Sequence, residues 1–245
     1  MMRVAVFLAS MAFSLASFAG LKSQLDDHLA CPAPEPGQYR ILFIGDSITR
    51  HSFSEETIRN LGWGHVSGMA ATSDQMDFPG VVSRLIQQDR GQPVVRCYHT
   101  YGGGGSIAER IQGFKNVADT KPDLVVIQLG EHDDAEADVY KFRFDYARLL
   151  DMAKGMSSNP KVVAVGPWYP SALESKGVYP ADQVKIDSEM RSISAFKRVP
   201  YRSVSDIASI LGTQGRGTSA GVMWHPNDYG HSLYAQKIFE MYKQH

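Results

Sequence analysis

Two polar segments near opposite ends of the chain carry side chains suited to nucleophilic catalysis. Residues 45–49 read GDSIT, follow an apolar run and place the hydroxyl of Ser47 on a tight turn. Residues 224–231 read WHPNDYGH and place His225 on a loop before the last amphipathic segment. A serine hydroxyl becomes a nucleophile when a neighbouring histidine takes its proton. Each residue alone also has a simpler interpretation, because serine commonly caps helices and a lone histidine is commonly structural.

Two further polar segments lie between these. Residues 101–106 read YGGGGS, and the glycines either form a flexible loop or let the backbone approach a ligand closely. They do not form the dinucleotide fingerprint, because Ile107 stands where a third spaced glycine is needed. Residues 130–134 read GEHDD. His132 can donate a hydrogen bond or join a carboxylate in binding a metal, while the acidic residues equally suit the start of a helix.

The elements that must position these segments are short buried strands alternating with amphipathic helices. Apolar runs rich in valine and isoleucine predict five strands, over Arg40–Ile44, Val94–Tyr98, Leu124–Leu129, Lys161–Val165 and Tyr201–Val204. Apolar stripes predict helices within 81–86, 107–118, 139–153, 181–196 and 234–241. Ser106 and Glu109 form a capping box for the second of these.

This alternation of strands and helices predicts an α/β domain of three layers with a mainly parallel five-stranded sheet. Ligand sites in such sheets lie outside the carboxyl ends of the strands. Three of the four polar segments directly follow predicted strands. We therefore expect the site at that edge of the sheet.

Composition and charge indicate one globular domain without a bulk attraction for polyanions. The chain has 245 residues, of which 43% are hydrophobic, and a formal net charge of -1 with a pI near 6.7. This length suits a single domain, which we place at residues 39–245. Because the sequence has no dense run of lysine and arginine, a nucleic-acid partner is not expected.

The first 38 residues are predicted to precede the domain. Arg3 is followed by an apolar run over Val4–Phe18 that ends in small residues, as in a secretory signal peptide cleaved after Ala19. The alternative is an N-terminal membrane anchor. Residues 20–38 contain three prolines and are predicted to be extended. We therefore expect a signal peptide at 1–19, a secreted or periplasmic location, and no membrane span after cleavage.

The chain has two cysteines, Cys31 and Cys97. In an oxidising compartment they can form one disulfide that ties the N-terminal segment to the core. Alternatively, Cys97 is simply a small buried residue of an apolar-rich strand. The sequence leaves both alternatives open.

In order and placement, the four polar segments resemble the SGNH (GDSL-type) hydrolase family. Residues 45–49 resemble its nucleophile block, Gly105 the glycine of its second block, and residues 225–227 its histidine block. The resemblance implies a flavodoxin-like α/β/α sandwich and ester hydrolysis through an acyl-enzyme, with Ser47 as nucleophile and His225 as base. It implies an oxyanion hole built from the backbone N–H groups of Ser47 and Gly105 plus a donor from the third block. It requires neither a metal nor an organic cofactor.

Two positions depart from the family pattern. Where the family has an asparagine this chain has His132, whose neutral ring can still donate one N–H to the oxyanion, with an altered pH profile. Where the family has an aspartate, three residues before the catalytic histidine, this chain has Val222. Asp228 lies near, but its expected role is helix capping. We therefore expect a Ser–His dyad, with His225 oriented by a backbone carbonyl, a water or a carboxylate from elsewhere.

The substrate prediction depends on two tryptophans. Trp63, in an insert over 51–76 predicted to be irregular, and Trp168, after the fourth strand, either form an aromatic wall for a sugar ring or acyl chain or pack the loops. The wall favours an O-acetyl or short-acyl esterase acting on a small ester or an acylated carbohydrate. The alternatives are a lysophospholipase or thioesterase, favoured by a long apolar cleft, and a non-catalytic carbohydrate-binding module, favoured by the two departures.

Overall fold

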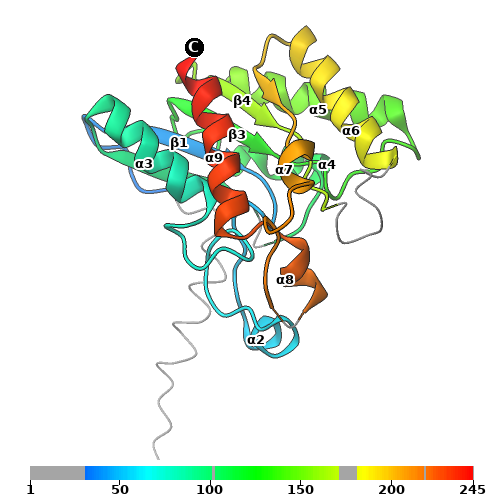
Figure 1. The fold of residues 1–245 in the computed structure, drawn as a ribbon. Coiled ribbons are helices and arrows are strands. Elements are labelled where there is room, and N and C mark those ends of the chain that lie inside the picture. The colour runs from blue at the N-terminus through cyan, green and yellow to red at the C-terminus, as the bar shows by residue number, and fades with distance from the viewer. Residues whose placement is uncertain (1–30, 101–102, 171–180, 218, 245) are drawn as a thin grey trace, which may run out of the picture.

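A computed structural model describes residues 31–100, 103–170, 181–217 and 219–244 (Figure 1). At its centre lies a sheet whose strands are β1 (Tyr39–Ile44), β2 (Val94–His99), β3 (Leu124–Gln128), β4 (Lys161–Val165) and β5 (Tyr201–Arg202). All neighbouring strands pair in parallel, in the order β2-β1-β3-β4-β5. This is the order of a flavodoxin-like fold. The predicted α/β class and the parallel five-stranded sheet are therefore confirmed.

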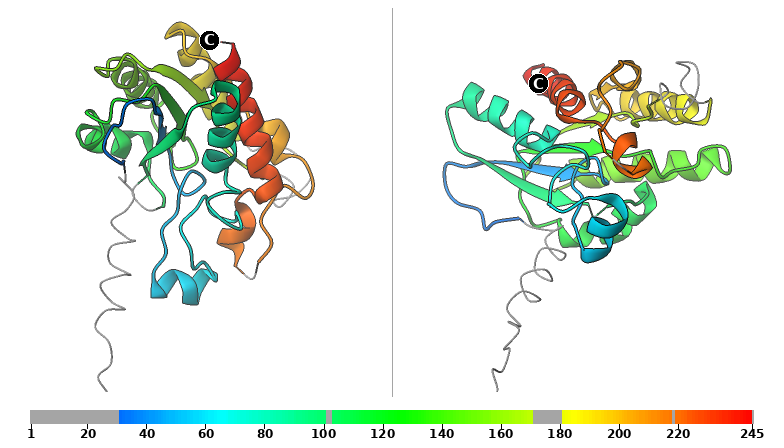
Figure 2. Two further views of the ribbon diagram at one scale, coloured as in Figure 1. Left: turned by 90° about the vertical axis from the view of Figure 1, so that its left-hand side faces the viewer. Right: turned by 60° about the horizontal axis from the view of Figure 1, so that its bottom comes forward.

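Helices cover both faces of the sheet (Figures 1 and 2). The helices α3 (Phe78–Arg90) and α9 (Asp228–Lys243) pack on one face, together with the short α7 (Ser205–Ala208). The opposite face is covered by α4 (Ile107–Gly113), the 3-10 turn η2 (Phe114–Asn116), α5 (Val139–Lys154) and α6 (Ala181–Phe196). These are the three layers that the sequence predicts.

The central strands are mostly apolar because both of their faces are buried. In β1, Ile41 and Phe43 contribute to the core under α3 and α9, whereas Leu42 and Ile44 contribute to the core under α4 and α5. All four side chains are fully buried. Successive side chains of a strand point to opposite faces, so a strand between two helical layers needs a continuous apolar run.

Differences from the predicted elements fall in short segments. The bounds of β4 and α6 are those predicted, and Ser106 and Glu109 do form the capping box of α4. The last strand is shorter, because Val204 leaves the sheet and becomes the N-cap of α7. Within the insert over 51–76, expected to be irregular, the chain forms α2 (Glu55–Leu61). The helix α8 (Ala220–Trp224) was also not predicted.

The helices α2 and α8 lie side by side, away from the sheet, and form a small lobe (Figures 1 and 2). The lobe has its own apolar cluster of Trp63, Met69 and Val222, with Phe53, Leu61 and Ala70 packed against it. The turn after β1 leads into this lobe, and α8 leads back from it to α9. The lobe therefore joins the nucleophile segment to the histidine segment.

Cys31 and Cys97 form a disulfide, which decides between the two alternatives left by the sequence. Beside it, the buried Arg40 donates to the carbonyl of Pro32 at 2.8 Å, so the start of the described chain is fixed to β1. The predicted signal peptide at 1–19 and residues 20–30 lie outside the described residues. Among the helices of the described part, none combines the length and hydrophobicity needed to cross a bilayer.

Candidate active site

The structure brings Ser47 and His225 together although 178 positions separate them in the sequence. Ser47 stands on the turn after β1, and His225 is the residue at which α8 ends. The distance from Ser47 Oγ to His225 Nε2 is 2.7 Å, which is a hydrogen bond. Both residues are almost fully buried. A serine and a histidine in this arrangement can transfer the hydroxyl proton to the ring.

A backbone carbonyl orients the ring of His225. Its Nδ1 lies 2.6 Å from the carbonyl oxygen of Gly221, in the last turn of α8. That oxygen is free to accept because the backbone N–H of His225 bonds to Val222 instead, as happens where a helix ends. Because Nδ1–H must donate to a carbonyl, Nε2 carries the lone pair that faces Ser47. A backbone carbonyl, a water and a carboxylate were the three groups expected to orient His225, and in the structure the group is a backbone carbonyl.

Val222, at the position of the missing aspartate, and the nearby carboxylate of Asp228 both have contacts away from the ring of His225. Val222 is buried against the cluster of Trp63 and Met69. Asp228 accepts from the backbone N–H and the hydroxyl of Thr72 at 2.8 and 2.7 Å. Capping of α9, expected of Asp228, is done by Asn227, whose side chain accepts from two backbone N–H groups of the first turn.

The surroundings of His225 keep its ring neutral. Burial is the largest effect and lowers the pKa of His225 to about 3, although the bond to Gly221 favours the charged form. His51, His231 and His132 lie close enough to lower the pKa further by charge repulsion. A neutral ring at ordinary pH can accept the proton of Ser47 at once.

Gly105 belongs to a loop that runs past the nucleophile turn. Within the described part of the chain, the backbone N–H groups of Ser47 and Gly105 have no protein acceptor. The φ of Gly105 is +129°, and a Cβ there would come within 2.5 Å of the guanidinium of Arg110, so only glycine fits. Tyr101 and Gly102, at the start of the glycine run, lie outside the described residues.

A buried arginine ties this loop to the nucleophile turn. Arg110 of α4 is 1% exposed, and it donates to the carbonyls of Gly45, Thr100 and Gly104 at 2.8, 2.9 and 2.6 Å. Its planar guanidinium serves several acceptors in fixed directions at once. The distance between the first and second blocks is therefore set by this side chain, which the sequence analysis did not single out. The position of Arg110 on α4, directly after the glycine loop, is the feature of the sequence that could have pointed to this role.

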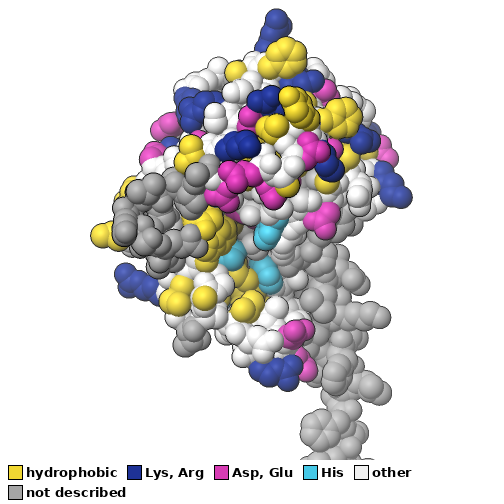
Figure 3. Space-filling model, turned by 90° about the vertical axis from the view of Figure 1, so that its right-hand side faces the viewer, with side chains coloured by type: hydrophobic (Ala, Val, Ile, Leu, Met, Phe, Trp, Pro, Cys, Tyr) yellow, Lys and Arg dark blue, Asp and Glu magenta, His cyan; other side chains and the backbone are white. Residues whose placement is uncertain are grey.

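His132 lies at the edge of the site. Its side chain is 45% exposed, and its Nε2 is 4.0 Å from Asp46 Oδ2. Its ring also lies against Gly104, where a Cβ would be 3.4 Å from Cε1. Figure 3 shows histidine side chains grouped in a hollow of the surface. Next to His132, Asp133 accepts from the backbone N–H of Ile107 and so joins the third block to the start of α4.

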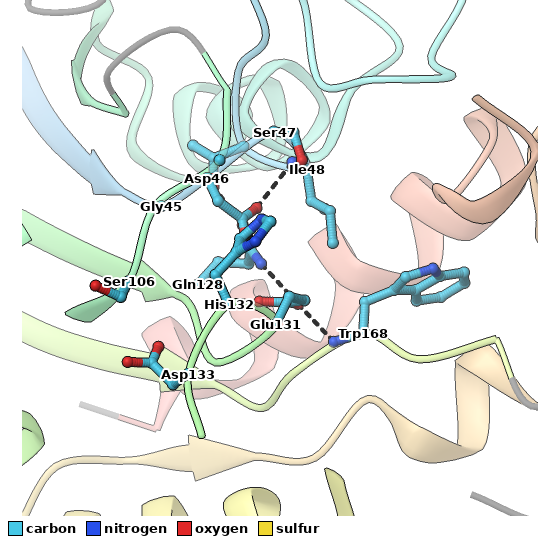
Figure 4. A network of polar contacts seen from close by, with 12 residues as sticks. Gly45, Asp46, Ser47, Ile48, Ser106, Gln128, Glu131, His132, Asp133 and Trp168 are labelled. Atoms are coloured by element: carbon cyan, nitrogen blue, oxygen red, sulfur yellow. Dashed lines mark hydrogen bonds and ion pairs between the residues drawn. The ribbon is translucent and has the colours of Figure 1, made fainter. Parts of the chain in front are cut away.

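Behind the nucleophile turn lies a network of polar side chains (Figure 4). The hydroxyl of Thr49 donates to Gln128 at 2.7 Å, and the amide of Gln128 donates to Glu131 at 2.9 Å. Glu131 also accepts from the backbone N–H of Trp168 at 2.6 Å. The network thus connects the ends of β1, β3 and β4. The sequence analysis noted the acidic cluster but gave Glu131 no role.

The structure does not place Trp63 and Trp168 in an aromatic wall. Trp168 is 0% exposed, packs against Tyr234, and donates its ring N–H to the carbonyl of Trp224 at 2.8 Å. Trp63 is 3% exposed and contacts the ring of His65. Both rings therefore pack inside the protein, which is the second of the two alternatives, and the prediction that they form a wall for the substrate is wrong.

The described residues include no group of three or more histidine, cysteine, aspartate or glutamate side chains that could hold a metal ion.

A hydrogen-bonded serine and histidine beyond the carboxyl ends of a parallel sheet, between two helical layers, define a serine hydrolase site on an α/β/α sandwich. The profile of the GDSL-like Lipase/Acylhydrolase family matches residues 43–233. The chain therefore belongs to this family and is a serine hydrolase that acts on esters. Among curated proteins, no sequence matches it.

Solved structures of esterases share the fold at low sequence identity. An acetylxylan esterase, Axe2 from Geobacillus stearothermophilus, has 17% identity and a TM-score of 0.58, over 83% of this chain and 93% of that one. TesA has 16% identity and a TM-score of 0.58, over 84% and 98%. The psychrotrophic esterase EstA from Pseudoalteromonas sp. has 15% identity and a TM-score of 0.55, over 84% and 97%.

Proposed function

We propose that this protein removes O-acetyl or other short acyl groups from carbohydrate through a covalent acyl-enzyme. Ser47 Oγ attacks the ester carbonyl while Nε2 of His225 takes its proton, and the tetrahedral intermediate then collapses. The C–O bond to the alcohol breaks, and His225 returns the proton to that alcohol. Water attacks the acyl-enzyme in the same way, which releases the acid and restores the serine.

The oxyanion of each tetrahedral intermediate is held by the backbone N–H groups of Ser47 and Gly105 and by a ring N–H of His132. The two backbone groups have no other acceptor in the described part of the chain. Donors fixed in advance around a developing negative charge lower the barrier more than donors that must reorient. Arg110 supplies that fixation by holding both blocks together.

The observation that carries the proposal is the bond of 2.7 Å between Ser47 Oγ and His225 Nε2, with the opposite ring nitrogen bound to Gly221. A histidine with a purely structural role needs a hydrogen bond at only one ring nitrogen. Here the two side chains are paired in the tautomer that proton abstraction requires, in a ring that stays neutral.

Two observations support a carbohydrate substrate. A cavity of about 510 Å³ begins at Gly104 and Gly105, beside the catalytic pair rather than around it, and continues along α4 and η2. Neither Ser47 nor His225 lines it, and its other lining side chains are polar, namely Glu109, Arg110, Gln112, Lys115 and Asn116. Such a lining suits the hydroxyl groups of a sugar better than a long acyl chain. In addition, Axe2, a structural neighbour, is described as an acetylxylan esterase.

Activity against nitrophenyl esters of increasing chain length and against acetylated xylo-oligosaccharides tests this function, with Ser47→Ala as the control. We expect turnover that depends on Ser47, is largest for acetyl and falls sharply with longer chains. A long-chain optimum would instead indicate a lysophospholipase or thioesterase. Absence of turnover dependent on Ser47 would indicate a non-catalytic carbohydrate-binding module.

We also propose that residues 1–19 are a signal peptide and that the mature protein is secreted or periplasmic. The disulfide between Cys31 and Cys97 supports an oxidising compartment. N-terminal sequencing of the protein recovered from a secreting host is expected to begin at Gly20. Recovery of the protein with Met1 in the membrane fraction would contradict cleavage and favour an anchor.

A further inference from the structure

Two carboxyl groups lie together directly behind the nucleophile turn. Asp46 precedes Ser47 and is 0% exposed, and Glu131 reaches toward it from the loop after β3 (Figure 4). The two carboxyl groups interact, since each affects the pKa of the other. Buried carboxylates are expensive unless each oxygen has a donor. The hydrogen-bond partners of the four carboxyl oxygens therefore indicate the protonation state of the pair.

One oxygen of each carboxyl is satisfied. Oδ1 of Asp46 accepts from the backbone N–H of Ile48 at 2.9 Å. Oε1 of Glu131 accepts twice, from the backbone N–H of Trp168 at 2.6 Å and from the side chain of Gln128 at 2.9 Å. The other two oxygens, Asp46 Oδ2 and Glu131 Oε2, are buried and have no donor in the described residues.

A single proton between these two oxygens satisfies both. Two ionised carboxyl groups in contact repel each other, whereas a neutral one donates a strong charge-assisted hydrogen bond to an ionised one. Desolvation raises the pKa of Asp46, and it raises the pKa of Glu131 well above its usual value, with the charge of Asp46 adding to the effect. Glu131 is therefore the partner that keeps the proton.

We propose that Glu131 is protonated at neutral pH and donates a hydrogen bond to Asp46 Oδ2, and that it thereby acts as a positioning residue for the nucleophile turn. Its catalytic consequence rests on the proposed function, but its protonation does not. Through Asp46 the bond fixes Ile48, the neighbour of Ser47, and through Oε1 it fixes the end of β4. The pair carries one negative charge.

The charged groups around the pair are few. His132 and Arg110 face Asp46 and favour its ionised form, although neither forms a hydrogen bond to its carboxyl. Asp133 is also affected by the charge of Asp46. In contrast, burial and the charge of Asp46 raise the pKa of Glu131, and the N–H donors of Trp168 and Gln128 oppose them. The charge of Arg110 therefore favours the ionised state of Asp46 and leaves the proton on Glu131.

Infrared difference spectroscopy of the isotopically exchanged protein tests the protonation directly. Asp77 is also buried and its pKa is raised to about 7, so it contributes a carbonyl band of its own at pH 7. We therefore expect the band of protonated carboxylic acids in wild type to lose one component in Glu131→Gln, where the amide replaces the shared proton by an N–H and leaves the carboxylate of Asp46. The exposed Glu136→Gln is the matched control and should keep the band. A wild-type spectrum without any protonated-acid band, or a Glu131→Gln spectrum that keeps the whole wild-type band, would overturn the proposal.

Activity and stability test the positioning role. Glutamine mimics the protonated acid, so Glu131→Gln should stay within a few-fold of wild type in kcat/KM, whereas Glu131→Ala should lose roughly 10- to 100-fold. Equal losses in both would show that a charged carboxylate is needed and would contradict the proposal.

In wild type, the free energy of unfolding should fall as pH rises above the ordinary glutamate pKa of about 4.3, because the folded state holds the proton more tightly. Glu131→Gln should lack this part of the slope, and an unchanged slope would count against the proposal.

Discussion

At the scale of single residues, the site is defined by what holds the imidazole of His225. A carboxylate in the third position of a triad orients the ring and also stabilises the imidazolium that forms during catalysis. The carbonyl of Gly221 orients the ring equally well at 2.6 Å, but it carries no net charge. The dyad therefore holds His225 in the correct tautomer, but it stabilises the imidazolium less than a triad with a carboxylate would.

The roles of His225 and Asp228 can be separated by substitution. His225→Ala should lower kcat by on the order of 10³-fold or more, because it removes the base. Asp228→Asn should change kcat little, since an asparagine can still accept from the backbone N–H of Thr72 and donate to its hydroxyl. Steady-state kinetics with a nitrophenyl acetate substrate measures both. Near-equal losses would assign the catalytic carboxylate to Asp228.

The pH profile reports the environment of His225. Because burial lowers its pKa to about 3, the ring stays neutral well below the ordinary histidine value of about 6.5. We expect kcat/KM, which reflects the free enzyme, to show no acid limb centred near pH 6.5 and to remain high at about pH 5. An acid limb with a midpoint between about 6 and 7 would show that the ring is more hydrated or better charge-stabilised than the structure indicates.

At the scale of elements, the catalytic geometry depends on α4 as much as on the strands. Arg110 is buried and holds carbonyls on both sides of the oxyanion donors, at Gly45 and at Gly104. A lysine has one ammonium and cannot reach the three carbonyls in the fixed directions of a guanidinium.

Arg110→Lys should therefore lower kcat by roughly 10- to 100-fold, with a smaller change in KM, because misplaced oxyanion donors weaken transition-state binding. The matched control is Arg143→Lys, which alters an arginine paired with Glu189 on the surface and should leave kcat unchanged. If Arg110→Lys retained full kcat, the loop would be held by other contacts.

The elements that can be predicted well from the sequence are those with a regular apolar pattern. The strand β4 and the helices α5 and α6 have long, regular apolar patterns, and their bounds match or nearly match the predictions. The helix α8 has five residues and no periodicity to detect, yet it supplies Gly221. Trp168 follows a strand, as residues of a ligand site do, but a tryptophan at that position can equally pack in the core. The local sequence does not distinguish a site tryptophan from a core tryptophan, and the structure has it in the core. The partners of Glu131 and Arg110 come from other segments and required the fold.

At the scale of the whole molecule, the disulfide fixes the N-terminal segment to the sheet. Cys31 and Cys97 are separated by 66 positions, and closing a loop of that length restricts the unfolded chain by about 4 kcal/mol in the chain-entropy account. Cys31→Ala should therefore lower the melting temperature by roughly 10 °C while leaving activity at 25 °C intact, since neither cysteine takes part in the hydrogen bonds that hold Ser47 and His225.

Thermal unfolding with and without reductant measures this effect. Reductant should lower the melting temperature of wild type toward that of Cys31→Ala and should not change that of the variant. Equal melting temperatures for the oxidised and reduced wild type would show that the bond does not contribute to stability.

The central claim is that Ser47, activated by His225, forms the covalent intermediate. Mass spectrometric mapping after reaction with a fluorophosphonate tests it most directly, because the reagent adds to an activated serine. We expect one phosphonyl adduct, on Ser47, that is absent in Ser47→Ala and forms far more slowly in His225→Ala. An adduct on another residue, or full esterase activity without any adduct on Ser47, would contradict it.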